Sequence, residues 1–390
     1  MKILHITTDN KFISAALNTF ESVYPNQNTV WMLNSGQNVD LSNKKYDKLF
    51  SFKQTFLPSF LKEVGSFDLV ILHSLILQWY PLISLAPIGT KFAWLGWGYD
   101  YYNYIYVDSQ KLLLEDTVKV EQHLKDINKS RLTIKSIVKY PAKIAFNVVI
   151  KKVALKRITS FSPVIKEDYE LVKSAKKIPF LPTFMPWNYG SLEEDLIKNF
   201  IGKRADGHSI LVGNSATLTN NHIEVFNFLS NLNLNDGVKV ITPLSYGDES
   251  YKKKVIEVGN EKLKYSFEPI MDFIPIHEYI DLIKECGYVI MNHKRQQGVG
   301  NIVIMLYLGA RVFLREDNPT YKMLKKEGVI LNTVQELESN SELLKCRLSE
   351  DEIKKNIEVL YKHWSKEAIN RKTKDLVEFH LGSPLCIVNK

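Results

Sequence analysis

The sequence has few of the features that would assign a chain to a class at once. Its three cysteines, Cys286, Cys346 and Cys386, lie far apart and form no Cys-x-x-Cys pair or Cys/His cluster, so neither a disulfide framework nor a zinc site is indicated. No run of 18 or more apolar residues occurs, which argues against a transmembrane helix. The opening MKILHITTDN has the pattern of a strand, not of a signal peptide. A cytosolic protein is therefore expected.

The length of 390 residues predicts two domains, because one domain commonly has about 100 to 200 residues. Short apolar runs alternate with helical patterns in both halves, which predicts an α/β protein with parallel sheets covered on both faces. The expected strands are Ile3–Thr7, Thr29–Leu33, Lys48–Phe52, Asp68–Leu72, Lys91–Trp94, Ser209–Val212, Val238–Thr242, Leu263–Phe267, Tyr288–Met291, Arg311–Leu314 and Val329–Leu331.

A proline-rich stretch, residues 178–190, marks the end of the first domain, and a polar linker follows it. The charged pattern from Glu350 to Leu381 predicts a C-terminal helix that packs back on the first domain. The expected domains are residues 1–190, 205–365 and, as the C-terminal helix, 366–390.

The positive net charge is concentrated in one segment. Between Lys125 and Arg157 ten Lys or Arg residues stand against the single acid Asp126, interleaved with aliphatic residues. This mixture favours helices on an anionic membrane over nucleic-acid binding, and a buried apolar face with a solvated basic back is the structural alternative. The residues expected to face the membrane or a membrane-bound acceptor are Lys135, Lys139, Lys143, Lys151, Lys152, Lys156 and Arg157.

The segment from His293 to Tyr321 reads as strand end, glycine-bearing turn, helix, strand and polar turn. Gln296 to Asn301 would sit at the helix N-terminus, where backbone N–H groups and the helix dipole attract anions. Lys294 and Arg295 add positive charge. The segment therefore predicts a diphosphate site, and a tight turn without a ligand is the alternative reading.

A second polar turn, Gly213 to His222, follows the expected strand that ends at Val212. Its Asn, Ser and Thr residues offer hydrogen-bond donors, although they are also common as turn and capping residues. Two such turns in one domain strengthen the diphosphate hypothesis. Glu316 and Asn318 can hold a ribose or base, or can stabilise the N-terminus of the helix that follows Pro319.

In the first domain, the turns after strands carry His5, Asp9, His73 and Asp100. A carboxylate or imidazole there can take a proton from an acceptor hydroxyl. Asp100 is the first candidate for a base, because it follows two glycines within a cluster of Trp and Tyr residues that suits sugar rings. A helix N-cap is the alternative for Asp100, and a satisfied core histidine is the alternative for His5 and His73.

At these residues the chain resembles a known family. The motifs are ILVGNS with Asn221 and His222 behind it, RQQGVG at Arg295 to Gly300, REDNP at Arg315 to Pro319, and WGYD at Trp97 to Asp100. They are similar to those of the transferases that move Fuc4NAc, a 4-acetamido-4,6-dideoxygalactose, from a dTDP-sugar to a lipid-linked disaccharide in enterobacterial common antigen synthesis.

The resemblance implies a GT-B glycosyltransferase, with two Rossmann-like domains facing a central cleft, that needs neither metal nor cofactor. It also implies a peripheral protein of the cytoplasmic face of the inner membrane, a dTDP-sugar donor, an undecaprenyl-diphosphate-linked saccharide acceptor, and no nucleic-acid partner. Inversion of configuration is favoured, and Asp100, His73 and Asp9 are the candidate catalytic residues. The expected donor-binding residues are Gly213, Asn214, Ser215, His222, Tyr246, Arg295, Gln296, Gln297, Gly298, Gly300, Asn301, Glu316 and Asn318.

Two other classes compete with this hypothesis. A non-catalytic basic α/β protein would bind nucleic acid through Lys125 to Arg157. A nicotinamide-dependent oxidoreductase is disfavoured, because HITTDN follows the first apolar run where such enzymes carry a GxGxxG turn.

Overall fold

A computed structural model describes residues 1–8, 13–34, 46–106, 108–129, 141–232 and 234–382. The chain divides into two compact units. Unit 1 comprises Met1–Val107, Lys135–Asp195 and His363–Lys390, and unit 2 comprises Asp108–Ile134 and Leu196–Lys362. No helix of the described part of the chain is both long and apolar enough to cross a bilayer.

Unit 1 is built on a parallel sheet with the strand order β3-β2-β1-β4-β5-β6-β7. The central strands β1, β4 and β5 are buried along their whole length, as expected for a parallel sheet covered on both faces. The bounds are β1 (Ile3–Thr7), β2 (Asn28–Leu33), β3 (Lys48–Phe50), β4 (Leu69–His73), β5 (Phe92–Leu95), β6 (Ile158–Ser162) and β7 (Thr183–Phe184).

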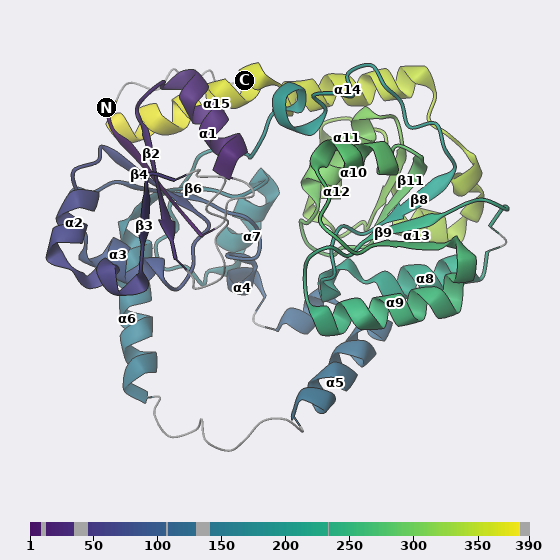
Figure 1. Cartoon of the computed structure of the whole chain (residues 1–390), viewed down its shortest axis with the longest axis horizontal. Coiled ribbons are helices and arrows are strands. Elements are labelled where there is room, and N and C mark those ends of the chain that lie inside the picture. Colours follow the sequence, from purple (N-terminus) through teal and green to yellow (C-terminus); the bar gives the residue numbers. More distant parts are fainter. Residues whose placement is uncertain (9–12, 35–45, 107, 130–140, 233, 383–390) are drawn as a thin grey trace. The chain divides into compact units, whose positions relative to one another are not determined.

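Helices cover both faces of this sheet. Helix α1 (Ile13–Val23) packs against α15 (Lys366–Leu381), which buries Leu376 and Val377 in the unit 1 core. Helices α2, α3 and α6 lie together away from that pair (Figure 1). The remaining bounds in unit 1 are α2 (Pro58–Val64), α3 (Trp79–Leu85), α4 (Tyr102–Ile105), α6 (Pro141–Arg157) and α7 (Lys166–Ala175).

Unit 2 repeats the scheme with the strand order β10-β9-β8-β11-β12-β13. Strand β8 pairs in parallel with both β9 and β11, so the loops that follow β8 and β11 leave the same edge side by side. The bounds are β8 (Ser209–Val212), β9 (Val240–Pro243), β10 (Phe267–Ile270), β11 (Cys286–Met291), β12 (Arg311–Leu314) and β13 (Asn332–Thr333).

In unit 2, helices α8 and α9 run along one face of the sheet and α10, α11 and α12 along the other (Figure 1). Helix α5 packs against α8 and α9. The bounds are α5 (Glu115–Lys129), α8 (His222–Ser230), α9 (Glu249–Leu263), α10 (Ile276–Ile283), α11 (Val299–Tyr307), α12 (Pro319–Lys326), α13 (Val334–Ser339) and α14 (Glu350–Trp364).

The prediction of two parallel α/β sheets is confirmed, but some element positions were wrong. The expected strand Leu263–Phe267 is mostly the end of α9 and a 3-10 turn, because Leu263 buries its side chain as a helical residue and Lys264 ends the helix with a positive φ. The expected strand Val329–Leu331 is a buried connection before β13. Strand β6 was not predicted at all.

The C-terminal helix expected over Glu350–Leu381 is two helices. Ser365 separates them, and its side chain accepts a hydrogen bond from the Ala368 N–H as the N-cap of α15.

The units divide the chain differently from the expected domain ranges, chiefly in one segment. Residues 108–134, expected within 1–190, group with unit 2. The side chain of Glu224 in α8 accepts hydrogen bonds from the backbone N–H and the hydroxyl of Thr117 in α5, at 2.8 and 2.7 Å. Leu114 likewise donates its N–H to Asn221. The acceptor and donor roles of the domains stay a prediction.

Candidate functional site

The candidate donor site is the polar edge of unit 2 where the loops after β8 and β11 meet. Gly213 begins the first loop with a φ of +67°. A Cβ atom there would lie 2.6 Å from Nε2 of His222 and 2.8 Å from Oδ1 of Asn220, closer than real Cβ contacts occur. Only glycine therefore lets the backbone turn over these two side chains.

Asn220 is the buried centre of the two loops. Its Oδ1 accepts from the Asn214 N–H at 3.0 Å and pairs with Nε2 of His293 at 2.7 Å. Its Nδ2 donates to the Ser215 carbonyl at 2.7 Å and to the Thr217 hydroxyl at 2.8 Å. Because His293 belongs to the loop after β11, this one amide ties the two loops together.

A second set of side chains lines the loops closer to solvent. Nε2 of Gln297 donates to Oδ1 of Asn214 at 3.0 Å, and Nδ2 of Asn214 donates to the Tyr246 hydroxyl at 2.9 Å. The Thr219 hydroxyl donates to Oε1 of Gln297 at 2.6 Å. These bonds fix the direction of each amide, and Tyr246 is still about half exposed.

Helix α11 starts at this edge. Gly298 precedes it with a φ of +64°, and Gly300 in its first turn is exposed. The first N–H groups of a helix have no acceptor within it, so they and the helix dipole favour an anion. Arg295 and Arg315 lie half-buried in the loops beside it. The edge thus offers backbone donors, amides and cations to a negatively charged group.

Lys294 is directed elsewhere. Its ammonium group donates to the carbonyl oxygens of Lys111 and Leu113, at 3.2 and 3.4 Å.

Some predicted donor residues are buried beneath this edge. His222 has no exposed surface, and burial lowers its pKa to about 3. Asn318 is also fully buried: its Oδ1 accepts from the Thr320 N–H as the N-cap of α12, and its Nδ2 donates to the carbonyl oxygens of His293 and Arg295. Ser215 and Gln296 are buried too, while Glu316 is exposed and Asn301 half-buried.

In unit 1, Asp100 is held by the backbone around it. Its Oδ2 accepts from the Leu75 N–H at 2.8 Å and from the Trp94 indole N–H at 2.7 Å, and its Oδ1 accepts from the Trp97 N–H at 2.9 Å. Burial raises the pKa of Asp100, and these hydrogen bonds oppose that rise. The carboxylate therefore joins the loops after β4 and β5.

A chain of hydrogen bonds crosses the same sheet from Asn28. Nδ2 of Asn28 donates to a Glu21 carboxylate oxygen and to the Tyr24 carbonyl, each at 2.8 Å. Its Oδ1 must then face Nε2 of His5, 3.2 Å away. This geometry makes Nε2 of His5 the protonated nitrogen and leaves Nδ1 as an acceptor.

The donor and acceptor roles of His73 and Tyr189 follow in the same way. Nε2 of His73 lies 3.0 Å from Nδ1 of His5 and must donate to it, so Nδ1 of His73 accepts. The Tyr189 hydroxyl, 2.7 Å away, donates its proton to that atom. Burial lowers the pKa of His5 to about 4 and that of His73 well below its ordinary value, which keeps both rings neutral.

Aromatic side chains surround Tyr189, the last residue of this series of hydrogen bonds. Trp97 packs edge-on against both Tyr99 and Tyr189, and the Tyr99 hydroxyl donates to Ser74, whose φ is +69°. Tyr99 is about half exposed. Such rings suit the apolar faces of a sugar.

The predicted membrane-facing residues fall into three groups. Lys135 and Lys139 lie outside the described residues, as do the side chain of Lys143 and the catalytic candidate Asp9, which is not one of the membrane-facing set. Lys152 and Lys156 are exposed on α6. Arg157 instead donates to the carbonyl oxygens of Ser84, Ala86 and Pro87, and the Lys151 ammonium lies 4.3 Å from the centre of the Tyr104 ring.

Asn220 and Tyr189 were not predicted as site residues. Asn220 was identified only as a helix-capping candidate, and Tyr189 only as part of a proline-rich stretch. Their signal in the sequence is local, whereas their partners lie far away in it. Within the described residues, no group of three or more His, Cys, Asp or Glu side chains is arranged to hold a metal ion.

A comparison of the sequence with protein families assigns the chain to one of them. The model for 4-alpha-L-fucosyltransferases, glycosyl transferase group 56, matches residues 142–361, more than half of the chain. The chain belongs to this family. The family predicted from the sequence motifs is thereby confirmed, and the protein is a glycosyltransferase.

Solved structures agree on the fold of the transferase. HepE from Anabaena in complex with UDP has a TM-score of 0.62 at 12% identity, over 97% of this chain and 100% of that one. Sucrose-phosphate synthase from Thermosynechococcus elongatus has a TM-score of 0.61 at 8% identity, over 98% of this chain and 100% of that one. The N-terminal domain of Candida albicans trehalose-6-phosphate phosphatase has a TM-score of 0.65 at 11% identity, over 98% of this chain and 97% of that one. The predicted GT-B fold is confirmed.

The buried histidines predict that unit 1 loses stability in mild acid. His5, His73 and His380 have lowered pKa values because they are buried, His5 and His380 to about 4. Below about pH 6.5 the unfolded chain takes up protons that the folded chain does not, so stability falls as pH falls from about 6.5 towards 4. Each histidine contributes about 1.4 kcal/mol per pH unit in that range.

Urea unfolding at pH 7, 6 and 5 tests this, followed by tryptophan fluorescence. All six tryptophans lie in unit 1, so the signal reports that unit alone. We expect His380→Gln to reduce the loss between pH 7 and pH 5 by roughly 2 kcal/mol. A free energy of unfolding that does not change over this range in the wild type would contradict the prediction.

Proposed function

We propose that the transferase moves a 4-amino-4,6-dideoxy sugar, Fuc4NAc or a close relative, from a dTDP-sugar to an undecaprenyl-diphosphate-linked saccharide. We further propose that it works without a metal ion, as a peripheral protein on the cytoplasmic face of the inner membrane. The observation that carries the proposal is the polar edge of unit 2, where the N-terminus of α11, Asn214, Gln297 and Arg295 come together.

The edge of unit 2 supports binding of the donor diphosphate. Gly298 and Gly300 add no side chain of their own at the N-terminus of α11, where the amide side chain of Asn214 lies against Gly298, and Arg295 supplies a cation next to it. HepE, a structure of similar fold, was determined in complex with UDP. Helix dipole, amides and arginine can together stabilise the negative charge that a metal ion neutralises in other transferases.

The proposed reaction is a displacement at the anomeric carbon. A hydroxyl oxygen of the acceptor forms the new bond, and the bond from that carbon to the β-phosphate oxygen breaks. The electron pair leaves with dTDP, and the hydroxyl proton passes to a base. Attack from the face opposite the leaving group inverts the configuration.

Among the candidate bases, hydrogen-bond geometry favours His73 acting through Tyr189, while burial opposes it by lowering the pKa of His73 and raising that of Tyr189. The Tyr189 hydroxyl already donates to Nδ1 of His73, so its oxygen can take a proton from an acceptor hydroxyl as its own proton moves to the ring. Both oxygens of Asp100, by contrast, already accept hydrogen bonds from N–H groups. Asp9 stays a candidate from the sequence alone.

The first experiment asks which nucleotide the protein binds and whether it transfers a sugar. Thermal shifts with dTDP, UDP, GDP, NAD and a short DNA duplex come first. We expect dTDP to stabilise the protein most, by roughly 2.7 kcal/mol at 100 times its dissociation constant. Release of dTDP from dTDP-Fuc4NAc that depends on a lipid-linked acceptor would complete the test. Salt-dependent DNA binding without sugar transfer would favour the nucleic-acid-binding alternative.

Arg295 and its neighbour Lys294 provide a matched pair. Arg295→Ala is expected to weaken dTDP binding about tenfold or more, because a charge-assisted hydrogen bond contributes roughly 1.5 to 3 kcal/mol. Lys294→Ala removes the same charge one residue away, but its ammonium group is bonded to Lys111 and Leu113, so a smaller effect is expected. Calorimetry with dTDP measures both, and an affinity of Arg295→Ala equal to that of the wild type would exclude Arg295 from the site.

Two variants separate the candidate bases. Tyr189→Phe keeps the ring and removes the hydroxyl, so turnover is expected to fall at least ~100-fold with dTDP affinity unchanged. Asp100→Asn replaces an acceptor by an NH2 group facing N–H donors, so it is expected to lower the stability of unit 1 by roughly 1 to 3 kcal/mol. If folded Asp100→Asn lost activity ~100-fold while Tyr189→Phe kept it, Asp100 would be the base and the relay would be wrong.

A further inference from the structure

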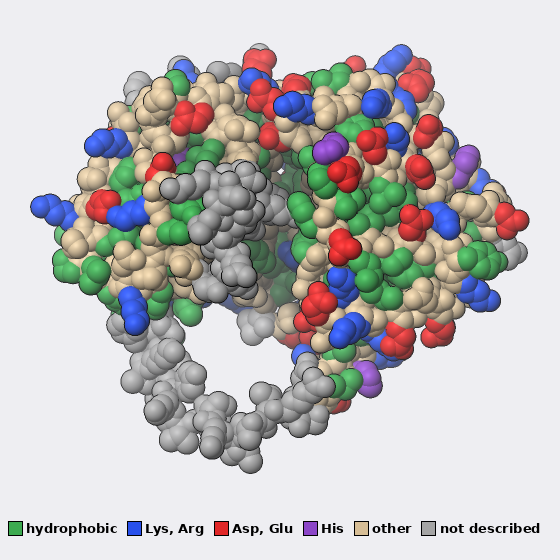
Figure 2. All heavy atoms as spheres, in the orientation of Figure 1, with side chains coloured by type: hydrophobic (Ala, Val, Ile, Leu, Met, Phe, Trp, Pro, Cys, Tyr) green, Lys and Arg blue, Asp and Glu red, His purple; other side chains and the backbone are tan. Residues whose placement is uncertain are grey.

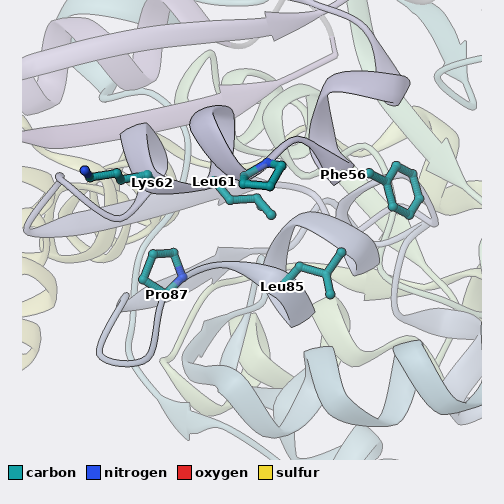
Figure 3. Close-up of a pocket in the computed structure, with 6 residues that line it drawn as sticks. Phe56, Leu61, Lys62, Leu85 and Pro87 are labelled. Carbon is teal, nitrogen blue, oxygen red and sulfur yellow. The ribbon is translucent and has the colours of Figure 1, made fainter.

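Unit 1 has an open apolar hollow that the proposed reaction does not use. It has a volume of about 410 Å³ and is lined by residues from α2, the segment before it, and the end of α3. Phe56, Leu61, Leu85 and Pro87 face one another across it, while Lys62 extends from α2 at its margin (Figure 3). Apart from that lysine, the lining is hydrophobic.

The surface around the hollow is also apolar. Phe52, Leu57 and Leu85 are each between 43% and 49% exposed, and Ile88, one residue beyond Pro87, is fully exposed. Hydrophobic side chains gather over the region of α2 and α3 in the space-filling view (Figure 2). Contiguous exposed apolar surface of this kind marks an interaction site.

Helix α6 continues this surface with a different composition. Arg157 at its end holds the carbonyl oxygens of Ala86 and Pro87, so α6 is fixed to the margin of the hollow. Val148, Val149 and Val153 are exposed on α6 together with Lys152 and Lys156. At 100° per residue these five positions fall within one stripe, while Ala154 and Leu155 face the core.

The charge of this surface has one sign. Residues 51–62, 77–90 and 141–157 contain no acid, although they contain several lysines. The nearest acid in sequence, Glu63, forms an ion pair with Lys48 at 2.5 Å. An apolar centre with a basic margin is complementary to the acyl chains and negative headgroups of an anionic bilayer. A protein partner would be expected to need polar and acid groups as well.

We propose that the α2–α3 hollow and the exposed stripe of α6 form one membrane-insertion surface, in which Phe56, Leu85 and Ile88 enter the acyl layer of an anionic bilayer. Lys62, Lys152 and Lys156 then lie at the level of the headgroups. The inference rests on the proposed function only in that a lipid-linked acceptor gives the transferase a reason to bind a membrane. The proposal identifies the side chains that enter the bilayer. The positive charge of residues 125–157 indicates a membrane but does not identify those side chains.

Flotation of the full chain with vesicles tests the surface. We expect binding to vesicles of phosphatidylglycerol and phosphatidylcholine in equal parts, and much weaker binding to pure phosphatidylcholine. Leu85→Ser with Ile88→Ser, and separately Lys152→Gln with Lys156→Gln, should each lower the partition coefficient at least about tenfold. Tyr265→Ser is the control, because Tyr265 is 83% exposed in unit 2 and should change nothing.

A probe on Phe56 separates insertion from surface adsorption. In a Cys346→Ser, Cys386→Ser background, Phe56→Cys carrying an environment-sensitive dye should shift its emission to the blue on binding anionic vesicles. An unchanged emission, or binding of the Leu85→Ser, Ile88→Ser variant equal to the wild type, would overturn the proposal. The proposal would also be overturned if the wild type formed a dimer and the Leu85→Ser, Ile88→Ser variant lost dimer formation but kept vesicle binding.

The test is independent of the proposed reaction. The tryptophan signal of unit 1 and calorimetric binding of dTDP by unit 2 should be unchanged in the Leu85→Ser, Ile88→Ser variant. If the wild type bound no dTDP but still partitioned through Leu85 and Ile88, the proposed function would fail and the insertion surface would stand. If transfer were shown and partitioning ignored these residues, only the surface would be wrong.

Discussion

The candidate donor site depends on one buried amide. Asn220 has almost no exposed surface, so every polar atom of its side chain must find a partner within the protein. It does so by bonding the backbone of its own loop and the ring of His293 in the next. Because an unsatisfied buried amide would cost about 1 to 3 kcal/mol, these bonds hold both loops in one conformation before a ligand arrives. A rigid edge of this kind can present N–H groups to a phosphate without rearrangement.

A similar constraint acts in unit 1, where the amide of Asn28 takes the place of Asn220. Its NH2 group is fixed by Glu21 and Tyr24, and that choice sets the tautomers of His5 and His73 in turn. The direction of the Tyr189 hydroxyl is therefore decided some distance away, by hydrogen bonds at the other end of the chain. Desolvation keeps both rings neutral. Only a neutral ring can accept a proton, and two adjacent charged imidazoles would repel each other.

The sequence predicted what depends on local pattern. The strands ending at Val212 and Met291 were recognised because each is a short apolar run followed by glycine and polar residues, and parallel pairing then brings their loops to one edge. Strand β6 was missed because Ile158 continues the apolar and basic pattern of α6 without a break. Segment 108–129 groups with unit 2 through ties to α8 that join residues more than a hundred positions apart, and the local pattern of the sequence does not reveal such ties. Asn220 and Tyr189 were overlooked for the same reason: their partners cannot be read from neighbouring residues.

The charged groups of the two units are used in different ways, and this difference follows from burial. Arg295 and the N-terminus of α11 lie at a polar edge, where a diphosphate can replace water without leaving a buried charge unpaired. Lys152 and Lys156 of α6 lie on an exposed stripe among valines, where their charge meets no acid of the same helix and stays in water. The first arrangement suits a small anion held by oriented donors, and the second suits a broad anionic surface held by many weak contacts. In the sequence, Arg295 and the lysines of α6 are equally positive. Their different burial in the structure is what distinguishes a small anion from a broad anionic surface as the expected partner.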